Sequence, residues 1–279
     1  MAQDQPLDGR SVVVTGATSG IGLAAAIEFA RLGADVAVVG RDPDRLATAL
    51  AAVDAVGPTG EIRGFRADFG SLDQVRSLAT QLGAAYPRID VLANNAGALV
   101  PRRRLTADGL ELTMQANHLA PFLLTHQLRH HVSGGRVITT SSDAHRNGTF
   151  DPEDLNLAGR VYRPLRAYGT SKQANILFAA ESARRWPDVF SASFHPGVVR
   201  TRFGNETVVI RAFYRVAPGL RTPAQGADTL IWLATTDLAE LVNGGYYERR
   251  RLTRPTRTAA DPDLAGRAWQ ASLTAVGLE

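Results

Sequence analysis

The chain has 279 residues, 44% of them hydrophobic and 21% charged, which is enough to bury one full core in an ordinary soluble globular protein. It contains no cysteine, so disulfides and thiolate metal sites are excluded, and no run approaches the roughly 20 apolar residues that a membrane-spanning helix needs. The net charge is only +4, and neither arginine cluster, at 102–104 or 249–251, is accompanied by stacking aromatic residues or a recognition motif, so we expect no nucleic-acid partner.

Short β-rich runs alternate with helical patterns along the chain, as in βαβ units around a parallel sheet. Strands are predicted at 11–14, 35–39, 62–67, 89–93, 136–140, 190–194 and 245–247. Helices are predicted at 21–32, 45–53, 72–86, 107–131, around 168–172, and at 224–234. No linker or internal repeat divides this series, so we expect one doubly wound α/β domain over residues 1–279, of Rossmann type, with about seven strands and helices on both faces. The first strand leaves no room for a leader, which favours a cytoplasmic protein.

A glycine-rich turn follows the first predicted strand and reads Thr15-Gly16-Ala17-Thr18-Ser19-Gly20-Ile21-Gly22. Glycines permit a tight turn and let backbone N–H groups at a helix N-terminus approach a pyrophosphate. A helix-capping turn without a ligand is the alternative. The position directly after a strand favours a dinucleotide site, with contacts from Gly16, Thr18, Ser19, Gly20, Ile21 and Gly22.

The end of the second predicted strand bears on the choice of cofactor. An acidic residue there would accept hydrogen bonds from a ribose 2′-hydroxyl, but the strand ends in Val39-Gly40-Arg41. A guanidinium suits a 2′-phosphate, so we expect NADP(H) in preference to NAD(H), with Arg41 as the contact. Asp42, one residue later, leaves NAD(H) as the alternative.

The chain contains 31 Lys and Arg residues, of which only Lys172 is a lysine. Because arginine is used at every other basic position, the exception suggests that a guanidinium cannot do what is needed at position 172. A lysine offers a compact ammonium on a flexible stem instead. Tyr168 lies four residues earlier, so on a helix the phenol and the ammonium share one face. An ordinary surface contact between the two side chains is the alternative.

Several sequence motifs follow one another along the chain in an order that is typical of one enzyme family. From Gly9 to about Glu248 the chain resembles the short-chain dehydrogenase/reductase family, and within it the branch of the retinol dehydrogenases. The family motifs are Thr15-Gly16-x-x-x-Gly20-x-Gly22, Asn94-Asn95-Ala96-Gly97, Asn117, Ser141-Ser142, Tyr168-x-x-x-Lys172 and Pro196-Gly197. The branch is indicated by Ser141-Ser142-Asp143-Ala144-His145, by the long stretch before Tyr168, by His195-Pro196-Gly197-Val198-Val199-Arg200-Thr201 and by Thr222-Pro223-Ala224-Gln225-Gly226-Ala227.

The resemblance implies a catalytic set of Asn117, Ser142, Tyr168 and Lys172. Tyr168 would exchange a proton with the substrate oxygen while a nicotinamide cofactor exchanges hydride with the carbon. Lys172 would favour the phenolate and hold the ribose hydroxyls, and Asn117 would support a water-linked proton path to it. Neighbouring serines on a strand face opposite ways; the family pattern selects Ser142 for the substrate oxygen and leaves Ser141 to packing.

Further cofactor contacts come from the same resemblance. They are Asp68 and Phe69 near the adenine, Asn94, Asn95, Ala96 and Gly97 after the fourth strand, Tyr168 and Lys172 at the ribose, and Pro196, Gly197 and Thr201 near the nicotinamide amide. Residues 198–221 would cover the substrate, and their apolar side chains suit a hydrophobic carbonyl or alcohol, although they could equally just pack the lid onto the body. The resemblance also implies a possible homodimer or homotetramer, formed through the helix that bears Tyr168 and Lys172.

Other interpretations of the sequence are weaker. Ser142, Asp143 and His145 could suggest a hydrolase, but near neighbours in sequence seldom form a triad and no G-x-S-x-G motif exists. His126 and His130 have metal-ligand spacing without a third ligand, so we expect a solvated helix face and no metal. A non-catalytic NADP sensor would be expected to lack Tyr168 or Lys172, and a nucleotide-sugar epimerase or dehydratase would have a larger C-terminal region.

Overall fold

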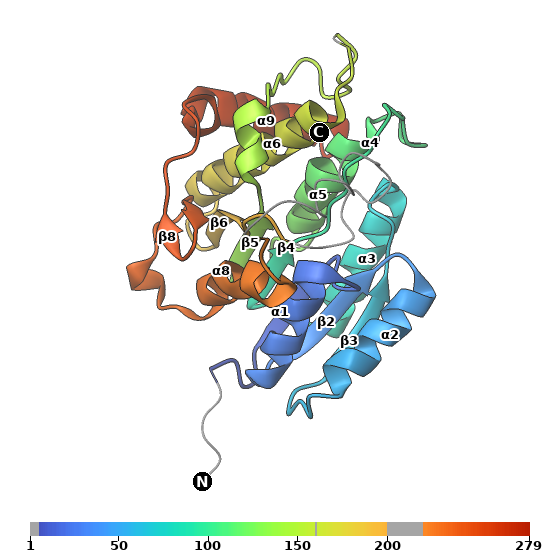
Figure 1. The fold of residues 1–279 in the computed structure, drawn as a ribbon, viewed down its shortest axis with the longest axis vertical. Helices are drawn as coiled ribbons and strands as arrows, with labels where there is room; N and C mark the ends of the chain where they lie inside the picture. The colour runs from blue at the N-terminus through green and yellow to red at the C-terminus, as the bar shows by residue number, and fades with distance from the viewer. Residues whose placement is uncertain (1–5, 160, 200–219) are drawn as a thin grey trace.

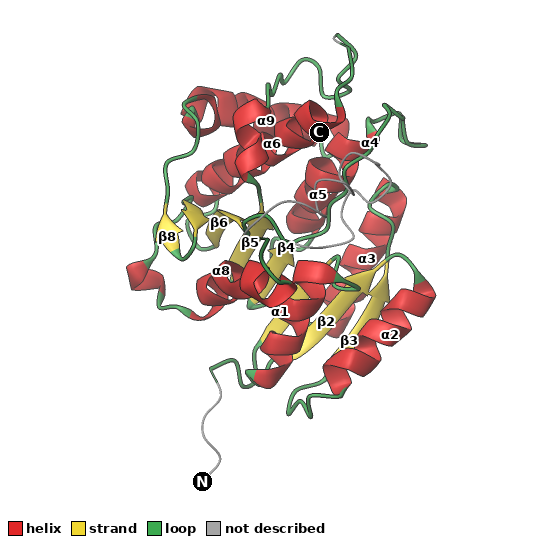
Figure 2. Cartoon of the chain, in the orientation of Figure 1, coloured by secondary structure: helices red, strands yellow, loops and turns green. Residues whose placement is uncertain are grey.

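The structure, a computed structural model, describes residues 6–159, 161–199 and 220–279. Its centre is an eight-stranded sheet in the order β3-β2-β1-β4-β5-β6-β7-β8, with helices on both faces (Figures 1 and 2). The strands are β1 (Ser11–Thr15), β2 (Asp35–Gly40), β3 (Ile62–Arg66), β4 (Val91–Asn94), β5 (Arg136–Thr140), β6 (Phe190–His195), β7 (Tyr246–Glu248) and β8 (Arg251–Leu252). All neighbours pair in parallel except β7 and β8. The expected doubly wound α/β fold is therefore confirmed.

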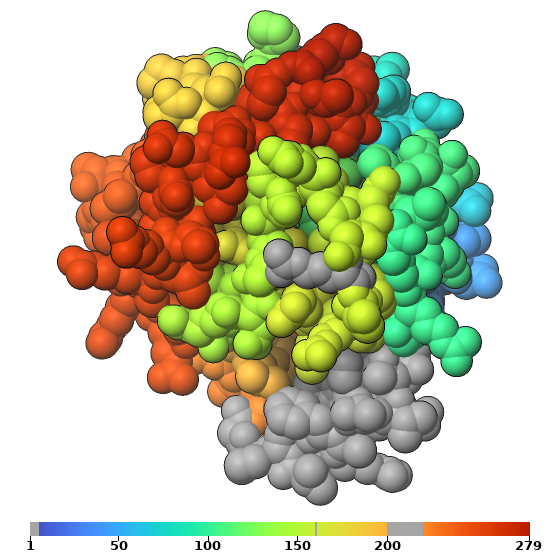
Figure 3. Space-filling model, turned by 90° about the horizontal axis from the view of Figure 1, so that it is seen from above, coloured from blue at the N-terminus to red at the C-terminus, as the bar shows by residue number. Residues whose placement is uncertain are grey.

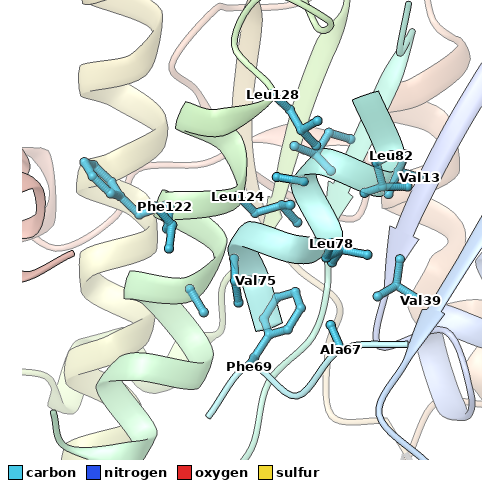
Figure 4. Close-up of a cluster of buried hydrophobic side chains, with 14 of the residues drawn as sticks. Val13, Val39, Ala67, Phe69, Val75, Leu78, Leu82, Phe122, Leu124 and Leu128 are labelled. Carbon is cyan, nitrogen blue, oxygen red and sulfur yellow. The ribbon is translucent and has the colours of Figure 1, made fainter. Parts of the chain in front are cut away.

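The helices form two layers. They are α1 (Gly20–Arg31), α2 (Pro43–Asp54), α3 (Leu72–Ala85), α4 (Leu112–Met114), α5 (Ala120–Gln127), α6 (Pro164–Arg185), α8 (Pro223–Thr235) and α9 (Pro262–Ala275), with short helices η1 (Gln115–Leu119), η2 (Asp143–Asn147), η3 (Leu238–Glu240) and η4 (Thr258–Ala260). Successive strand residues point to opposite faces, so Val12 and Val14 join the core under α1, α2 and α8. Val13 joins the other core, with α3 and α5, where Phe69 and Phe122 also lie (Figure 4).

The predicted helix at 107–131 is wrong at both ends. The chain first makes a turn in which Gly109 has φ +76°, a left-handed conformation that favours glycine. Glu111 then caps α4, because its carboxylate accepts from the backbone N–H of Met114 at 2.9 Å. A five-residue π-helix, η1, follows before α5 ends at Gln127. Local capping and turn geometry thus override the continuous helical pattern.

Two elements near the C-terminus were not predicted. Helix α9 begins at Pro262, capped by Asp261, and buries Trp269 among aromatic residues of α5 and α6. Strand β8 has only two residues, and it turns back from β7 through Arg249 and Arg250, both with positive φ. A strand that short carries no readable alternation, so seven predicted strands became eight.

Irregular segments at 148–159 and 161–163 precede α6. Tyr162 anchors this part of the chain to the loop after β4, because its hydroxyl donates to the carbonyl of Val100 at 3.0 Å. Arg103 donates to the carbonyl of Asn156 at 2.9 Å. In Figure 3 these segments, in yellow-green, lie on the surface beside the green residues of the chain that follow β4.

Candidate active site

The candidate site lies at the carboxyl ends of the strands, where the sheet order reverses. The chain passes from β3 back across β2 and β1 to β4, so β1 and β4 are neighbours whose following helices, α1 and α5, pack on opposite faces of the sheet. Ligands bind at such switch points in open α/β sheets, because the loops leave a crevice there. The glycine-rich turn follows β1 and residues 95–97 follow β4, so the structure brings these two predicted groups together.

Two glycines of the turn after β1 have no room for a side chain. A Cβ atom on Gly16 would lie 2.8 Å from the Cα of Ala96, and Gly16 has φ +67°. A Cβ atom on Gly22 would lie 2.4 Å from the carbonyl oxygen of Gly16 and 2.6 Å from Nδ2 of Asn95. Helix α1 begins here without a side-chain cap, so its first N–H groups can meet a pyrophosphate.

Thr15 joins the two loops, and sequence reasoning missed this role. Its Oγ1 donates to the carbonyl of Ala93 at 3.2 Å and accepts from the N–H groups of Asn95 and Ala96, both at 3.0 Å. The amide of Asn95 returns a hydrogen bond to the carbonyl of Thr15 at 3.0 Å. The sequence showed only a threonine immediately before the turn, and its complete burial is seen in the structure.

Arg41 lies beside the turn, at the end of β2. The strand end approaches closely, because a Cβ atom on Gly40 would lie 2.2 Å from the methyl carbon of Thr18. Arg41 is exposed, and its carbonyl accepts from the guanidinium of Arg66 at 3.1 Å, which places a second arginine nearby that the sequence did not suggest. Asp42 is engaged elsewhere: its carboxylate caps α2 by accepting from the N–H of Arg45 at 3.0 Å.

Three predicted cofactor contacts have side chains that the fold already uses. Phe69 is buried in the core beside Val75 (Figure 4). Asn94 donates to Thr125 of α5 at 2.9 Å. Asp68 accepts from the N–H of Gly70 at 2.9 Å while remaining partly exposed. Oδ1 of Asn94 is buried and has no hydrogen-bond partner among the described residues, and the roles of these three residues stay predictions.

Tyr168 and Lys172 form the predicted pair on α6. The Lys172 Nζ lies 5.5 Å from the centre of the Tyr168 ring and donates to the carbonyl of Thr140 at 2.9 Å. Lys172 is only 2% exposed, so the alternative of a surface contact is wrong. Burial lowers the pKa of Lys172 to about 7. A Cβ atom on Gly97 would lie 3.4 Å from Nζ, which explains how the loop after β4 reaches the lysine.

Asn117 ties that loop to α6. Its Oδ1 accepts from the N–H of Ala98 at 2.7 Å, and its Nδ2 donates to the carbonyl of Ala98 at 2.9 Å and to Oγ of Ser171 at 3.0 Å. Asn117 lies in the π-helix η1, a departure from α-helical bonding that often occurs at functional sites. The structure thus brings Asn117, Gly97 and Lys172 together.

The two serines after β5 point in different directions, as strand alternation predicted. Ser141 is buried, and its hydroxyl donates to the backbone carbonyl of Lys172 at 2.7 Å, which anchors α6 to the sheet. Ser142 is half-buried at the start of η2, where its Oγ accepts from the N–H of Ala144 at 3.2 Å. An oxygen that accepts this bond keeps its proton for another partner.

The hydrolase triad is not assembled. The Nδ1 of His145 bonds to the backbone carbonyl of Ser142 at 2.8 Å, and its Nε2 accepts from the N–H of Thr256 at 3.2 Å. Asp143 pairs with Arg146 at 2.5 Å. Both nitrogens of His145 are therefore used by the backbone, and burial lowers the pKa of His145.

His126 and His130 do not share a solvated face, contrary to expectation. His126 packs between the rings of Phe122, at 4.5 Å, and Trp186 and Trp269, each at 4.9 Å, whereas His130 is exposed. Burial lowers the pKa of His126 to about 4. Across the described residues no group of three His, Asp or Glu side chains could hold a metal ion.

Pro196 and Gly197 follow β6 and contact Arg221. The guanidinium of Arg221 donates to the carbonyl of Pro196 at 3.4 Å, and Val199 pairs with Arg221 as an isolated parallel bridge. Gly197 has φ +85°, and a Cβ atom there would lie 2.6 Å from Cδ of Arg221. Thr201 and nearly all of the predicted lid at 198–221 lie outside the described residues.

Comparison with known proteins gives consistent matches. The family profile of the short chain dehydrogenases matches residues 10–208. A Streptomyces sp. (strain C5) protein named "Putative daunorubicin C-13 ketoreductase DnrU" is 54% identical over 97% of this chain and 94% of its own length. Human retinol dehydrogenase 13 is 33% identical over 98% of this chain and 86% of its own.

Solved structures share the fold. A short chain dehydrogenase of Burkholderia cenocepacia J2315, solved in complex with NADP, superimposes with a TM-score of 0.69 and 25% identity, covering 86% of this chain and 96% of that one. No helix in the described part of the chain is both long enough and apolar enough to cross a membrane.

Proposed function

Because the chain belongs to the short-chain dehydrogenase/reductase family, in the branch of the retinol dehydrogenases, we propose that it is an NADP(H)-dependent reductase that interconverts a hydrophobic ketone or aldehyde and its alcohol. Membership makes it an oxidoreductase of that family. One observation carries the finer proposal: the only lysine of the chain is buried beside Tyr168, next to Gly97 of the loop after β4.

The chemistry divides among the residues of the site. The cofactor, when bound, supplies or accepts the hydride. Tyr168 donates the proton to the carbonyl oxygen, and Ser142 holds that oxygen as negative charge develops on it. Lys172 stabilises the phenolate through its ammonium. Asn117 keeps the loop after β4 against α6, and thereby keeps Gly97 beside the lysine.

NADP(H) is supported by the charges at the end of β2. Two guanidinium groups, Arg41 and Arg66, lie beside the turn, whereas the one acid there, Asp42, caps α2. A 2′-phosphate would be attracted by both cations, whereas the neighbouring carboxylate of Asp42 already accepts one hydrogen bond as a helix cap. The neighbouring structure from Burkholderia was solved with NADP.

The proposed substrate is a bulky apolar carbonyl compound. The Streptomyces relative is named for reduction of a ketone of daunorubicin, and other relatives for retinol. Exposed apolar side chains lie near the site residues in the chain: Val161 is 84% exposed, Leu165 on α6 is 60% exposed, and Val198 follows Gly197. Such side chains suit an apolar ligand.

Turnover assays test the proposal. Purified protein with NADPH should reduce a polycyclic aromatic ketone or retinal, and Tyr168→Phe should lose about 10²-fold or more of that activity while keeping the fold. NADPH binding without turnover on any carbonyl would favour a sensor instead. Conversion of a nucleotide sugar without net NADPH consumption would favour an epimerase or dehydratase.

The predicted pairing of subunits through α6 is not favoured by the burial of this helix. Between Ala167 and Ala183 no residue of α6 is exposed, because β5, β6, η2 and α9 surround it. We therefore propose that any oligomer forms through another surface. Cross-linking or light scattering of the purified protein tests this. A cytoplasmic location remains a prediction from the sequence.

A further inference from the structure

Asn175 lies one turn beyond Lys172 on α6 and is only 1% exposed. Neither the sequence motifs nor the four residues assigned to the chemistry give this buried amide a role. A buried amide must satisfy both its donor group and its acceptor, because an unpaired polar atom in the core costs about 1–3 kcal/mol. The partners of Asn175 therefore show what it holds in place.

The donor side of Asn175 bridges two elements. Its Nδ2 donates to the backbone carbonyl of Thr140, at the end of β5, at 3.1 Å, and to the backbone carbonyl of Asn117, in η1, at 3.0 Å. The carbonyl of Thr140 is the same oxygen to which the Nζ of Lys172 donates at 2.9 Å. Asn175 and Lys172 therefore donate to the same carbonyl oxygen. Asn175 also donates to the backbone of Asn117, the residue whose side chain lies next to Gly97.

The acceptor atom of Asn175, Oδ1, contacts the ring of His118, which in turn contacts helix α9. The Nδ1 of His118 lies 3.2 Å from Oδ1 of Asn175, and Nε2 of the same ring lies 3.0 Å from the hydroxyl of Ser272 in α9. Since Nδ2 of Asn175 faces two carbonyls, Oδ1 is the acceptor, so His118 carries its proton on Nδ1. The hydroxyl of Ser272 contacts Nε2 of His118 and donates to the backbone carbonyl of Ala268 at 2.7 Å. Burial lowers the pKa of His118 to about 4, which keeps this neutral tautomer at neutral pH.

We propose that Asn175 is a positioning residue for Lys172: its amide fixes the carbonyls of Thr140 and Asn117, and His118 and Ser272 fix the amide. The assignment rests on the proposed function, because it concerns the same site. The network reaches from α9 through η1 to β5, so a helix remote from the cofactor turn helps to set the place of the ammonium. Two titratable groups interact with Lys172 in this network, Tyr168 on α6 and His118 on η1.

The lone lysine makes a direct test possible. Protein labelled with ¹⁵N at lysine Nζ has a single side-chain resonance, that of Lys172, whose titration gives its pKa without any turnover assay. Asn175→Asp keeps the shape but places a carboxylate beside the ammonium. We expect the pKa of Lys172 to rise by about one unit or more, since an opposite charge at 4–6 Å favours the charged form.

Gln173→Glu is the matched control. Gln173 is on the same helix, is also 1% exposed, and is also a hydrogen-bonded amide, but it faces Phe150 and Thr258. We expect less than half the shift in this variant. An equal shift in the two variants, or none in Asn175→Asp, would overturn the proposal.

A truncation pair covers the case in which Asn175→Asp does not fold. Asn175→Ala should speed hydrogen exchange of the Lys172 ammonium about tenfold or more and lower kcat with little change in KM, whereas Gln173→Ala should change neither. Equal exchange rates in both variants would reject the positioning role. If the wild-type protein reduced no carbonyl, the proposed function would fail while the titration and exchange measurements still decided the role of Asn175.

Discussion

The two ends of the candidate site are built by different means. At the cofactor end, the turn at 15–22 is shaped by glycines whose missing side chains let backbone touch backbone, as between Gly16 and Ala96. At the chemical end, Lys172 is held by long-range hydrogen bonds that join β5, η1, α6 and α9. The cofactor end should therefore fail when bulk is added, and the chemical end when a polar group is changed without any change of bulk.

The largest expected effect is at the chemical end. Lys172→Arg keeps the charge, but a planar guanidinium cannot occupy a site that is 2% exposed and closed by Gly97. We expect a loss of about 10²–10⁴-fold in kcat/KM. Steady-state kinetics with NADPH and a reducible ketone measure the loss, with circular dichroism as the folding control. Near-normal turnover would mean that any cation suffices there.

Added bulk at the cofactor end should have the next largest effect. Gly22→Ala places a Cβ atom 2.4 Å from the carbonyl oxygen of Gly16, so the turn must move, and we expect about 2–4 kcal/mol of lost stability and loss of NADPH binding. Gly266→Ala is the control: Gly266 is also helical, but the nearest atom to its Cβ lies at 3.9 Å. The Gly266→Ala variant should be more stable to unfolding than the wild-type protein by about 0.5–1 kcal/mol. Similar effects in both variants would refute close packing as the cause.

Two buried threonines, one with hydrogen-bond partners for its hydroxyl and one without, test how much such polar contacts contribute to stability. Thr15 has three hydrogen bonds through its hydroxyl, so Thr15→Val should cost about 1–3 kcal/mol. The hydroxyl of Thr139 is buried and has no hydrogen-bond partner among the described residues, so Thr139→Val should be neutral or stabilise by up to about 1 kcal/mol. Urea unfolding of both variants measures the difference, and equal losses would contradict it.

The smallest expected effect concerns the choice of cofactor. Arg41→Ala should weaken NADPH binding by about tenfold, through loss of one charge-assisted contact, and leave NADH binding nearly unchanged. Arg31→Ala, at the far end of α1, is the control. Fluorescence titration with both cofactors provides the measurement. Equal losses for NADPH and NADH would reject a contact to the 2′-phosphate.

Features that depend on a few neighbouring residues were predicted from the sequence, and features that depend on distant residues were not. The glycine turn is contiguous, and its position after β1 was predicted because periodicity and glycine spacing act over a few residues. The opposite directions of Ser141 and Ser142 followed from strand alternation. The motif positions of Phe69 and Asn94 did not tell which way their side chains point, because that depends on what packs against them.

Longer-range features escaped prediction for the same reason. The π-helix at Asn117 and the early end of α5 arise from a capped start and a turn that the hydrophobic pattern does not record. The prediction of a solvated His126 was wrong because α9, which covers it with Trp269, was itself not foreseen.

By itself the sequence determined the family, the doubly wound sheet and the residues Tyr168 and Lys172, because these depend on short motifs, on alternation and on one conspicuous lysine. Only the tertiary structure decided that Lys172 is buried, that Asp42 is occupied as a helix cap, and that Asn175, His118 and Ser272 stand behind the ammonium. The physical reason is that burial and hydrogen-bond partnership arise between residues such as Thr140 and Ser272, which are far apart in the chain and meet only when the helices pack on the sheet.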